Sequence, residues 1–66
     1  MFEQITVDVA TGRISYPQPE GFVLDMERMY RSAARFAPHC PSVEMAVKHA
    51  IHEQLSAFRG LQSLPR

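Results

Sequence analysis

Residues 25–59 read DMERMYRSAARFAPHCPSVEMAVKHAIHEQLSAFR, and their apolar spacing predicts two helices joined by a short turn. Asp25 has the side chain of a helix N-cap and Pro38 interrupts the pattern, so the first helix is expected over residues 25–37. Its buried face is predicted to hold the apolar residues at helical spacing: Met26, Met29, Tyr30, Ala33 and Ala37. The opposite face is predicted to expose the polar residues: Glu27, Arg28, Arg31, Ser32 and Arg35.

The second helix is expected over residues 41–59. Pro41 suits the first helical position, and Ser42 is the alternative as a cap. A continuous apolar stripe predicts the buried side of this helix: Val43, Val47, Ile51, Leu55 and Phe58. Gly60 stands where a residue with positive φ commonly ends a helix. The short connection makes the two helices neighbours, as an αα-hairpin.

A β-hairpin is predicted over residues 3–16. Apolar and polar residues alternate from Gln4 to Asp8, and Ile14 and Tyr16 repeat the alternation on the return strand. Between the strands, Asp8 can accept hydrogen bonds from the backbone that follows it, and Gly12 can adopt positive φ. Two short strands joined by such a turn form a hairpin.

Residues 17–24 are expected to be a stiff linker, because Pro17 and Pro19 cannot donate hydrogen bonds to a sheet. The alternative, an exposed polyproline ligand, rests on one short Pro-x-Pro motif. The chain is therefore predicted to be one small α+β domain over residues 1–66. Its order is ββαα, with the αα-hairpin packed on the β-hairpin and a short tail at residues 60–66.

Charge and composition narrow the class of protein. Seven Lys and Arg residues balance seven Asp and Glu residues, so the chain lacks the strong positive field of proteins that bind nucleic acid mainly through phosphates. No apolar run reaches the roughly 20 residues that span a bilayer, and the early Glu3 does not fit a secretory signal. With one cysteine, Cys40, and no disulfide within the chain, a cytoplasmic location is expected.

The small size of the chain predicts oligomerisation. A domain of this length buries a modest core, and a single cysteine excludes stabilisation by an intrachain disulfide. A homodimer is expected in which two hairpins pair across a twofold axis into one shared sheet.

One grouping has the composition of a metal or nucleophile site: His39, Cys40, His49, His52 and Glu53. In the predicted second helix, Cys40 and His49 would be about 13.5 Å apart along the axis, too far for a catalytic dyad or one zinc shell. His49 and His52 share a face with Met45, Glu53 and Ser56, which is typical of a solvated helix surface. No catalytic, metal or cofactor residue is therefore predicted. A metal-bridged or redox-responsive dimer stays as an alternative.

Arg28, Arg31 and Arg35 fall within about 60° of one another on a helical wheel at about 100° per residue. Three guanidiniums on one edge can contact a partner's carboxylates or phosphates. Glu27 is placed to pair with Arg31 at i, i+4, so a self-neutralised solvated face is the simpler interpretation.

These patterns predict a small non-enzymatic protein-interaction module, a homodimer that acts as regulator, adaptor or inhibitor of a larger protein. Its size is also that of accessory proteins of phages or other mobile elements. The predicted partner-binding residues are Arg28, Arg31, Arg35, Met45, His49 and His52. The alternative is a dimeric DNA-binding regulator that uses the arginine edge.

The helix pair at residues 25–59 is similar to that of the ribbon-helix-helix DNA-binding dimers. In that family one strand leads almost directly into the first helix. Here a complete hairpin and the Pro17 and Pro19 linker intervene, so the chain is not identified as a member.

Overall fold

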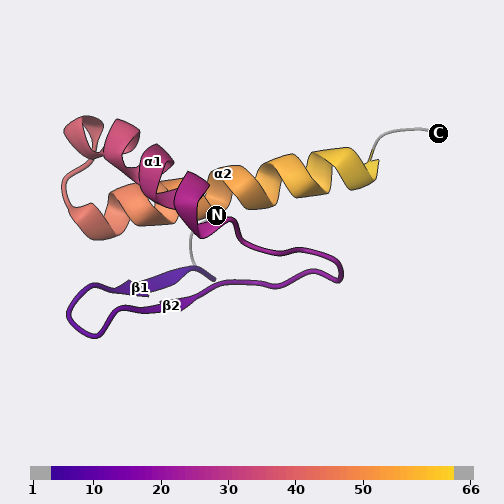
Figure 1. The fold of residues 1–66 in the computed structure, drawn as a ribbon, viewed down its shortest axis with the longest axis horizontal. Helices are drawn as coiled ribbons and strands as arrows, with labels where there is room; N and C mark the ends of the chain where they lie inside the picture. Colours follow the sequence, from indigo (N-terminus) through magenta and orange to yellow (C-terminus); the bar gives the residue numbers. More distant parts are fainter. Residues whose placement is uncertain (1–3, 64–66) are drawn as a thin grey trace.

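The computed structural model describes residues 4–63, with side chains up to residue 61. A β-hairpin is followed by two helices, so the predicted ββαα order of an α+β chain is confirmed (Figure 1). The elements are β1 (Thr6–Asp8), β2 (Arg13–Ser15), α1 (Met26–Phe36), the 3₁₀ helix η1 (Ala37–His39) and α2 (Val43–Ser63). None of the helices in residues 4–63 combines the length and apolar character that crossing a bilayer requires.

The hairpin forms by the turn chemistry that its sequence predicts. β1 and β2 pair antiparallel with Val7 opposite Ile14, and both of these side chains are half-buried. The Asp8 carboxylate accepts hydrogen bonds from the backbone N–H groups of Ala10, at 3.1 Å, and Thr11, at 3.3 Å. Gly12 closes the turn with φ of 72°, a conformation that glycine adopts without steric cost. Each strand is three residues long. β1 is thus shorter than the predicted alternation from Gln4 to Asp8, and β2 ends at Ser15, one residue before Tyr16.

Helix α1 begins as predicted but buries a different face. The Asp25 carboxylate accepts from the backbone N–H of Arg28 at 3.0 Å, which confirms the N-cap. Ser32 is 7% exposed, whereas Tyr30 is 61% exposed, so the predicted assignment of both side chains was wrong. The buried face is centred on Met29 and is rotated by about 60° from the predicted one, at 100° per residue. Ser32 tolerates burial because its hydroxyl finds an acceptor on α2.

Helix α2 begins at Val43 and continues to Ser63. The Ser42 hydroxyl accepts from the backbone N–H of Met45 at 3.2 Å, so Ser42 is the cap. Gly60 lies inside α2, and in residues 4–63 positive φ occurs only at two other glycines. The predicted helix end at Gly60 was therefore wrong, because the following residues continue the helix and a mid-helix glycine costs only about 1 kcal/mol. Val43, predicted to be buried, is 63% exposed.

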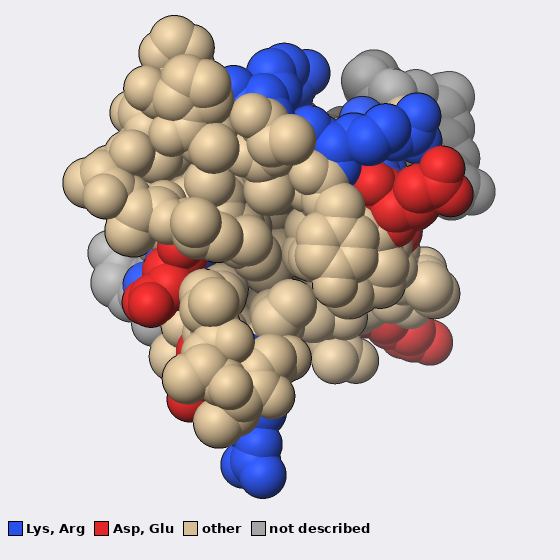
Figure 2. Space-filling model, turned by 60° about the vertical axis from the view of Figure 1, so that its left-hand side comes forward, with Lys and Arg blue, Asp and Glu red and all other residues tan. Residues whose placement is uncertain are grey.

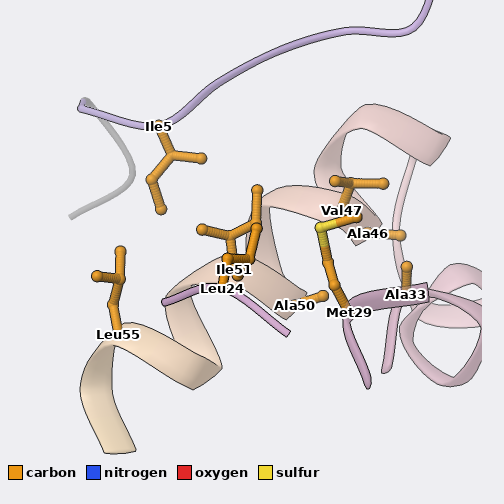
Figure 3. Close-up of a cluster of buried hydrophobic side chains, with 9 residues drawn as sticks. All are labelled: Ile5, Leu24, Met29, Ala33, Ala46, Val47, Ala50, Ile51 and Leu55. Carbon is orange, nitrogen blue, oxygen red and sulfur yellow. The ribbon is translucent and has the colours of Figure 1, made fainter. Parts of the chain in front are cut away.

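The core lies between the two helices and the hairpin (Figure 3). Its buried apolar residues are Ile5, Leu24, Met29, Ala33, Ala46, Val47, Ala50, Ile51 and Leu55. Alanines at the facing positions of α1 and α2 allow the two helices to approach closely, and the larger side chains fill the space toward the hairpin.

The linker between β2 and α1 is tied to α2 at its end. Asp25 donates its backbone N–H to Oε1 of Gln54 at 2.9 Å, and Nε2 of Gln54 donates to the backbone carbonyl of Asp25 at 2.9 Å. Earlier in the linker, the N–H of Phe22 donates to the carbonyl of Pro19, and the Phe22 ring contacts Phe58 of α2 with centroids 5.3 Å apart. These contacts fix the direction in which α1 starts.

Candidate interaction surface

The three arginines of α1 line one hollow at the junction with α2. This arginine hollow has a volume of about 490 Å³ and is lined by Arg28, Arg31, Ser32, Arg35 and Glu53. The arginines occupy one flank of α1 because positions separated by three and four residues lie on the same side of a helix. The structure thus brings together the three predicted arginines, and it adds a hydroxyl and a carboxylate beside them.

Glu53 is held in the hollow by two donors from α1. Its Oε1 accepts from the Ser32 hydroxyl at 3.0 Å, and its Oε2 lies 2.6 Å from Nη2 of Arg35. The Glu53 side chain is 33% exposed and that of Arg35 is 63% exposed. The Arg35 guanidinium also lies 4.9 Å from the centroid of the Phe36 ring, a cation–π contact that restrains its position.

The other two arginines are less constrained. Arg31 and Glu27 form the predicted i, i+4 pair at 4.0 Å, with side chains 74% and 85% exposed, and such pairs contribute little. In residues 4–63 no ion pair joins Arg28. Three guanidiniums and two carboxylates leave one net positive charge at this edge.

Figure 2 shows Lys and Arg side chains next to Asp and Glu side chains at the upper right, and a broad uncharged surface fills the centre of the same view. Further charged side chains lie at the left, the bottom and the lower right of that view.

The predicted α2 residues lie apart from the arginine hollow. Met45, His49 and His52 are half-buried, and the His49 ring lies 5.6 Å from the Phe36 ring. These side chains were expected on an exposed face, whereas the structure gives them intermediate exposure, and for His49 the nearby Phe36 ring of α1 accounts for the difference.

No metal cluster is present in the described part of the chain, since residues 4–63 contain no group of three or more His, Cys, Asp or Glu side chains placed to hold an ion. Cys40 is half-buried, packs against the core and is the C-cap residue of η1. A packing role accounts for this thiol.

Sequence reasoning missed two features of the surface. Glu53 was assigned to a solvated face, and only knowledge of the helix crossing places it opposite Ser32. The second feature is an apolar groove between the hairpin and the two helices, with Tyr30 and Val43 exposed at its rim. The apolar spacing of these two residues was a signal, but it was interpreted as core.

No family model, curated protein or solved structure matches the chain.

Proposed function

We propose that the chain is a non-enzymatic protein-interaction module whose arginine hollow binds an acidic segment of a larger protein. The chain would act as a regulator, adaptor or inhibitor of that protein. The observation that supports this is the convergence of Arg28, Arg31 and Arg35 around one seated carboxylate. The cytoplasmic location and the link to mobile elements stay predictions from the sequence.

The contacts of Glu53 indicate which chemistry the hollow accommodates. A hydroxyl and a guanidinium already hold one carboxylate, at 3.0 and 2.6 Å. Arg28 and Arg31 present further donors in the fork geometry that suits carboxylates. Within residues 4–63 no ion pair joins Arg28, and the pair of Arg31 with Glu27 is long, at 4.0 Å, and exposed. An incoming Asp or Glu can therefore bind without displacing Glu53.

The spacing of the arginines suits a helical partner segment. Arg28 and Arg35 are seven residues apart, which is about 10 Å along the axis at 1.5 Å per residue. Acidic residues at i, i+3 and i+7 of a second helix repeat this spacing, as charged positions do beside a coiled-coil seam. We therefore expect the partner segment to be an acidic helix that lies along α1.

Nucleic acid is the less favoured ligand. Phosphate-backbone binding scales with the number of positive charges that replace counterions. Here Glu27 and Glu53 offset two of the three guanidiniums, so the edge carries one net positive charge. A DNA-binding regulator stays as the alternative that the experiment below separates.

The test is a nuclease-treated pull-down from the native host with three versions of the tagged chain. The first is wild type, and the second is the triple variant Arg28→Ala, Arg31→Ala and Arg35→Ala. The third is a control that removes three positive charges elsewhere, at Arg13, Lys48 and Arg59. One dominant protein that is retained by wild type and the control, and lost by the hollow variant, is the expected result. Recovery of nucleic acid alone when nuclease is omitted would move the DNA-binding alternative to first place.

We also propose that the chain is a homodimer with a shared sheet. β1 lies against α2, whereas in residues 4–63 β2 has only β1 as a neighbouring element, so the outer edge of β2 is open. An open strand edge presents unpaired backbone donors and acceptors to another strand. Sedimentation velocity at tens of micromolar tests the dimer, and a mass of 7.5 kDa at all concentrations would contradict it.

A further inference from the structure

We infer that the apolar groove between the hairpin and the two helices is the surface on which the second copy packs. This inference rests on the proposed homodimer and assigns its interface. The groove has a volume of about 190 Å³ and is lined by Val7, Asp8, Val9, Gly12, Ile14, Met29, Tyr30, Val43 and Val47. Among the described residues of that lining, Asp8 is the one that carries a charge.

The rim of the groove is apolar and accessible. Val9 is 53% exposed, Tyr30 is 61% exposed and Val43 is 63% exposed. They come from the hairpin turn, α1 and α2, so three separate elements present apolar side chains around one depression. Met26, 44% exposed, is on the same flank of α1 as Tyr30. α1 thus has an apolar flank that residues 4–63 leave partly exposed.

The groove adjoins the open edge of β2. Ile14 of β2 lies on the side of the hairpin that lines the groove, and β2 is paired only on its β1 side within the described residues. A strand added at this edge would extend the sheet, and its inward side chains would meet the groove. Backbone pairing and apolar packing are therefore available to the same partner.

A second copy of this chain suits that edge. If two β2 strands pair antiparallel about a twofold axis at Ile14, Ile14 faces its own copy and Arg13 faces Ser15 of the other chain. No like charges are then opposite one another, and Asp8 is opposite Arg13 within each hairpin.

The first experiment measures the dimer constant by sedimentation equilibrium for Val43→Lys, Tyr30→Lys and a matched control, Val23→Lys. All three side chains are exposed in the single chain, Val23 at 85%, and Val23 does not line the groove. The two groove variants are expected to weaken dimerisation by about tenfold or more, since a buried unpaired ammonium opposes association. The Val23 variant is expected to match wild type.

The second experiment locates the strand edge by disulfide trapping in a Cys40→Ala background. Chains with Arg13→Cys are mixed with chains carrying Ser15→Cys and oxidised. Directly opposite residues in paired strands are about 5 Å apart at Cβ, close to the separation that a disulfide needs. A disulfide-linked mixed dimer of these two variants is expected. A chain with Thr6→Cys in β1 is expected to form no disulfide with the Arg13→Cys chain or with the Ser15→Cys chain.

The outcomes separate the two proposals. A monomer at every concentration overturns the homodimer and the interface together, and leaves the arginine hollow unaffected. A dimer that all three lysine variants preserve, or that traps no mixed disulfide, overturns the groove interface alone. Circular dichroism of each variant confirms that a lost dimer is not a lost fold.

Discussion

Gln54 provides the sharpest test of how the helix pair is held together. This side chain is 7% exposed and makes two hydrogen bonds of 2.9 Å with the backbone of Asp25. Gln54→Ala removes both and leaves the Asp25 N–H without its acceptor, while the Asp25 carbonyl keeps the N–H of Met29. Each neutral bond contributes about 1 kcal/mol, and an unpaired, partly buried donor adds to the loss. We expect unfolding free energy to fall by about 2–3 kcal/mol.

Gln54→Glu tests whether the bridge, the pair of hydrogen bonds between the Gln54 side chain and the Asp25 backbone, needs one donor and one acceptor. The new carboxylate still accepts from the Asp25 N–H, but its second oxygen faces the Asp25 carbonyl oxygen, where the amide donated. We expect a loss at neutral pH at least as large as that of Gln54→Ala. Part of it should return in acid, because the protonated carboxyl can donate to that carbonyl.

The assay is urea unfolding followed by far-ultraviolet circular dichroism at one fixed protein concentration, since dimerisation would otherwise shift the midpoint. A domain of this size has roughly 3–10 kcal/mol of stability, so the variants should remain folded without denaturant. Gln18→Ala, an exposed change in the linker, is the control and should stay within about 0.5 kcal/mol. A cost below about 0.5 kcal/mol for Gln54→Ala would refute the role of the bridge.

Four further changes test other parts of the structure. Ile51→Ala, at a side chain with 0% exposure, should cost about 2–5 kcal/mol in the same assay, and a smaller loss would mean that the core collapses around the site. Gly60→Ala should stabilise the chain by about 0.5–1 kcal/mol, because Gly60 is helical and nothing lies within 4 Å of the added Cβ. Gly12→Ala should destabilise the chain by about 1 kcal/mol, because the backbone φ of Gly12 is 72°, where an L side chain is strained. Destabilisation by Gly60→Ala would instead support a helix end there. Glu53→Gln removes a negative charge from the hollow, so an acidic peptide should bind about threefold more tightly, and unchanged or weaker binding would show that Glu53 does not oppose the ligand.

The sequence predicted the elements better than the helix faces. Alternation around Val7 and Ile14, the turn residues Asp8 and Gly12, and the cap at Asp25 are local signals, and the structure confirms each of them. Local signals suffice because these features depend on residues within a few positions of one another.

The candidate surfaces could be predicted only in part. Helical spacing alone predicts that the three arginines share one side of α1. The position of Glu53 beside Ser32 depends on how α1 crosses α2, which no local sequence pattern predicts. The apolar groove was missed for a related reason. Tyr30 and Val43 have the spacing of core residues, and periodicity does not distinguish an apolar side chain that meets its own chain from one that awaits a partner.

Binding at the arginine hollow can be measured by fluorescence anisotropy with a labelled helical peptide that carries Glu at i, i+3 and i+7. Wild type should bind at least about tenfold more tightly than the triple variant of Arg28, Arg31 and Arg35. The charge-matched variant of Arg13, Lys48 and Arg59 should stay within about threefold of wild type, and an oligonucleotide of equal length should bind no more tightly than the peptide. Equal losses in both triple variants, or no binding by wild type at millimolar peptide, would contradict the proposed interaction site.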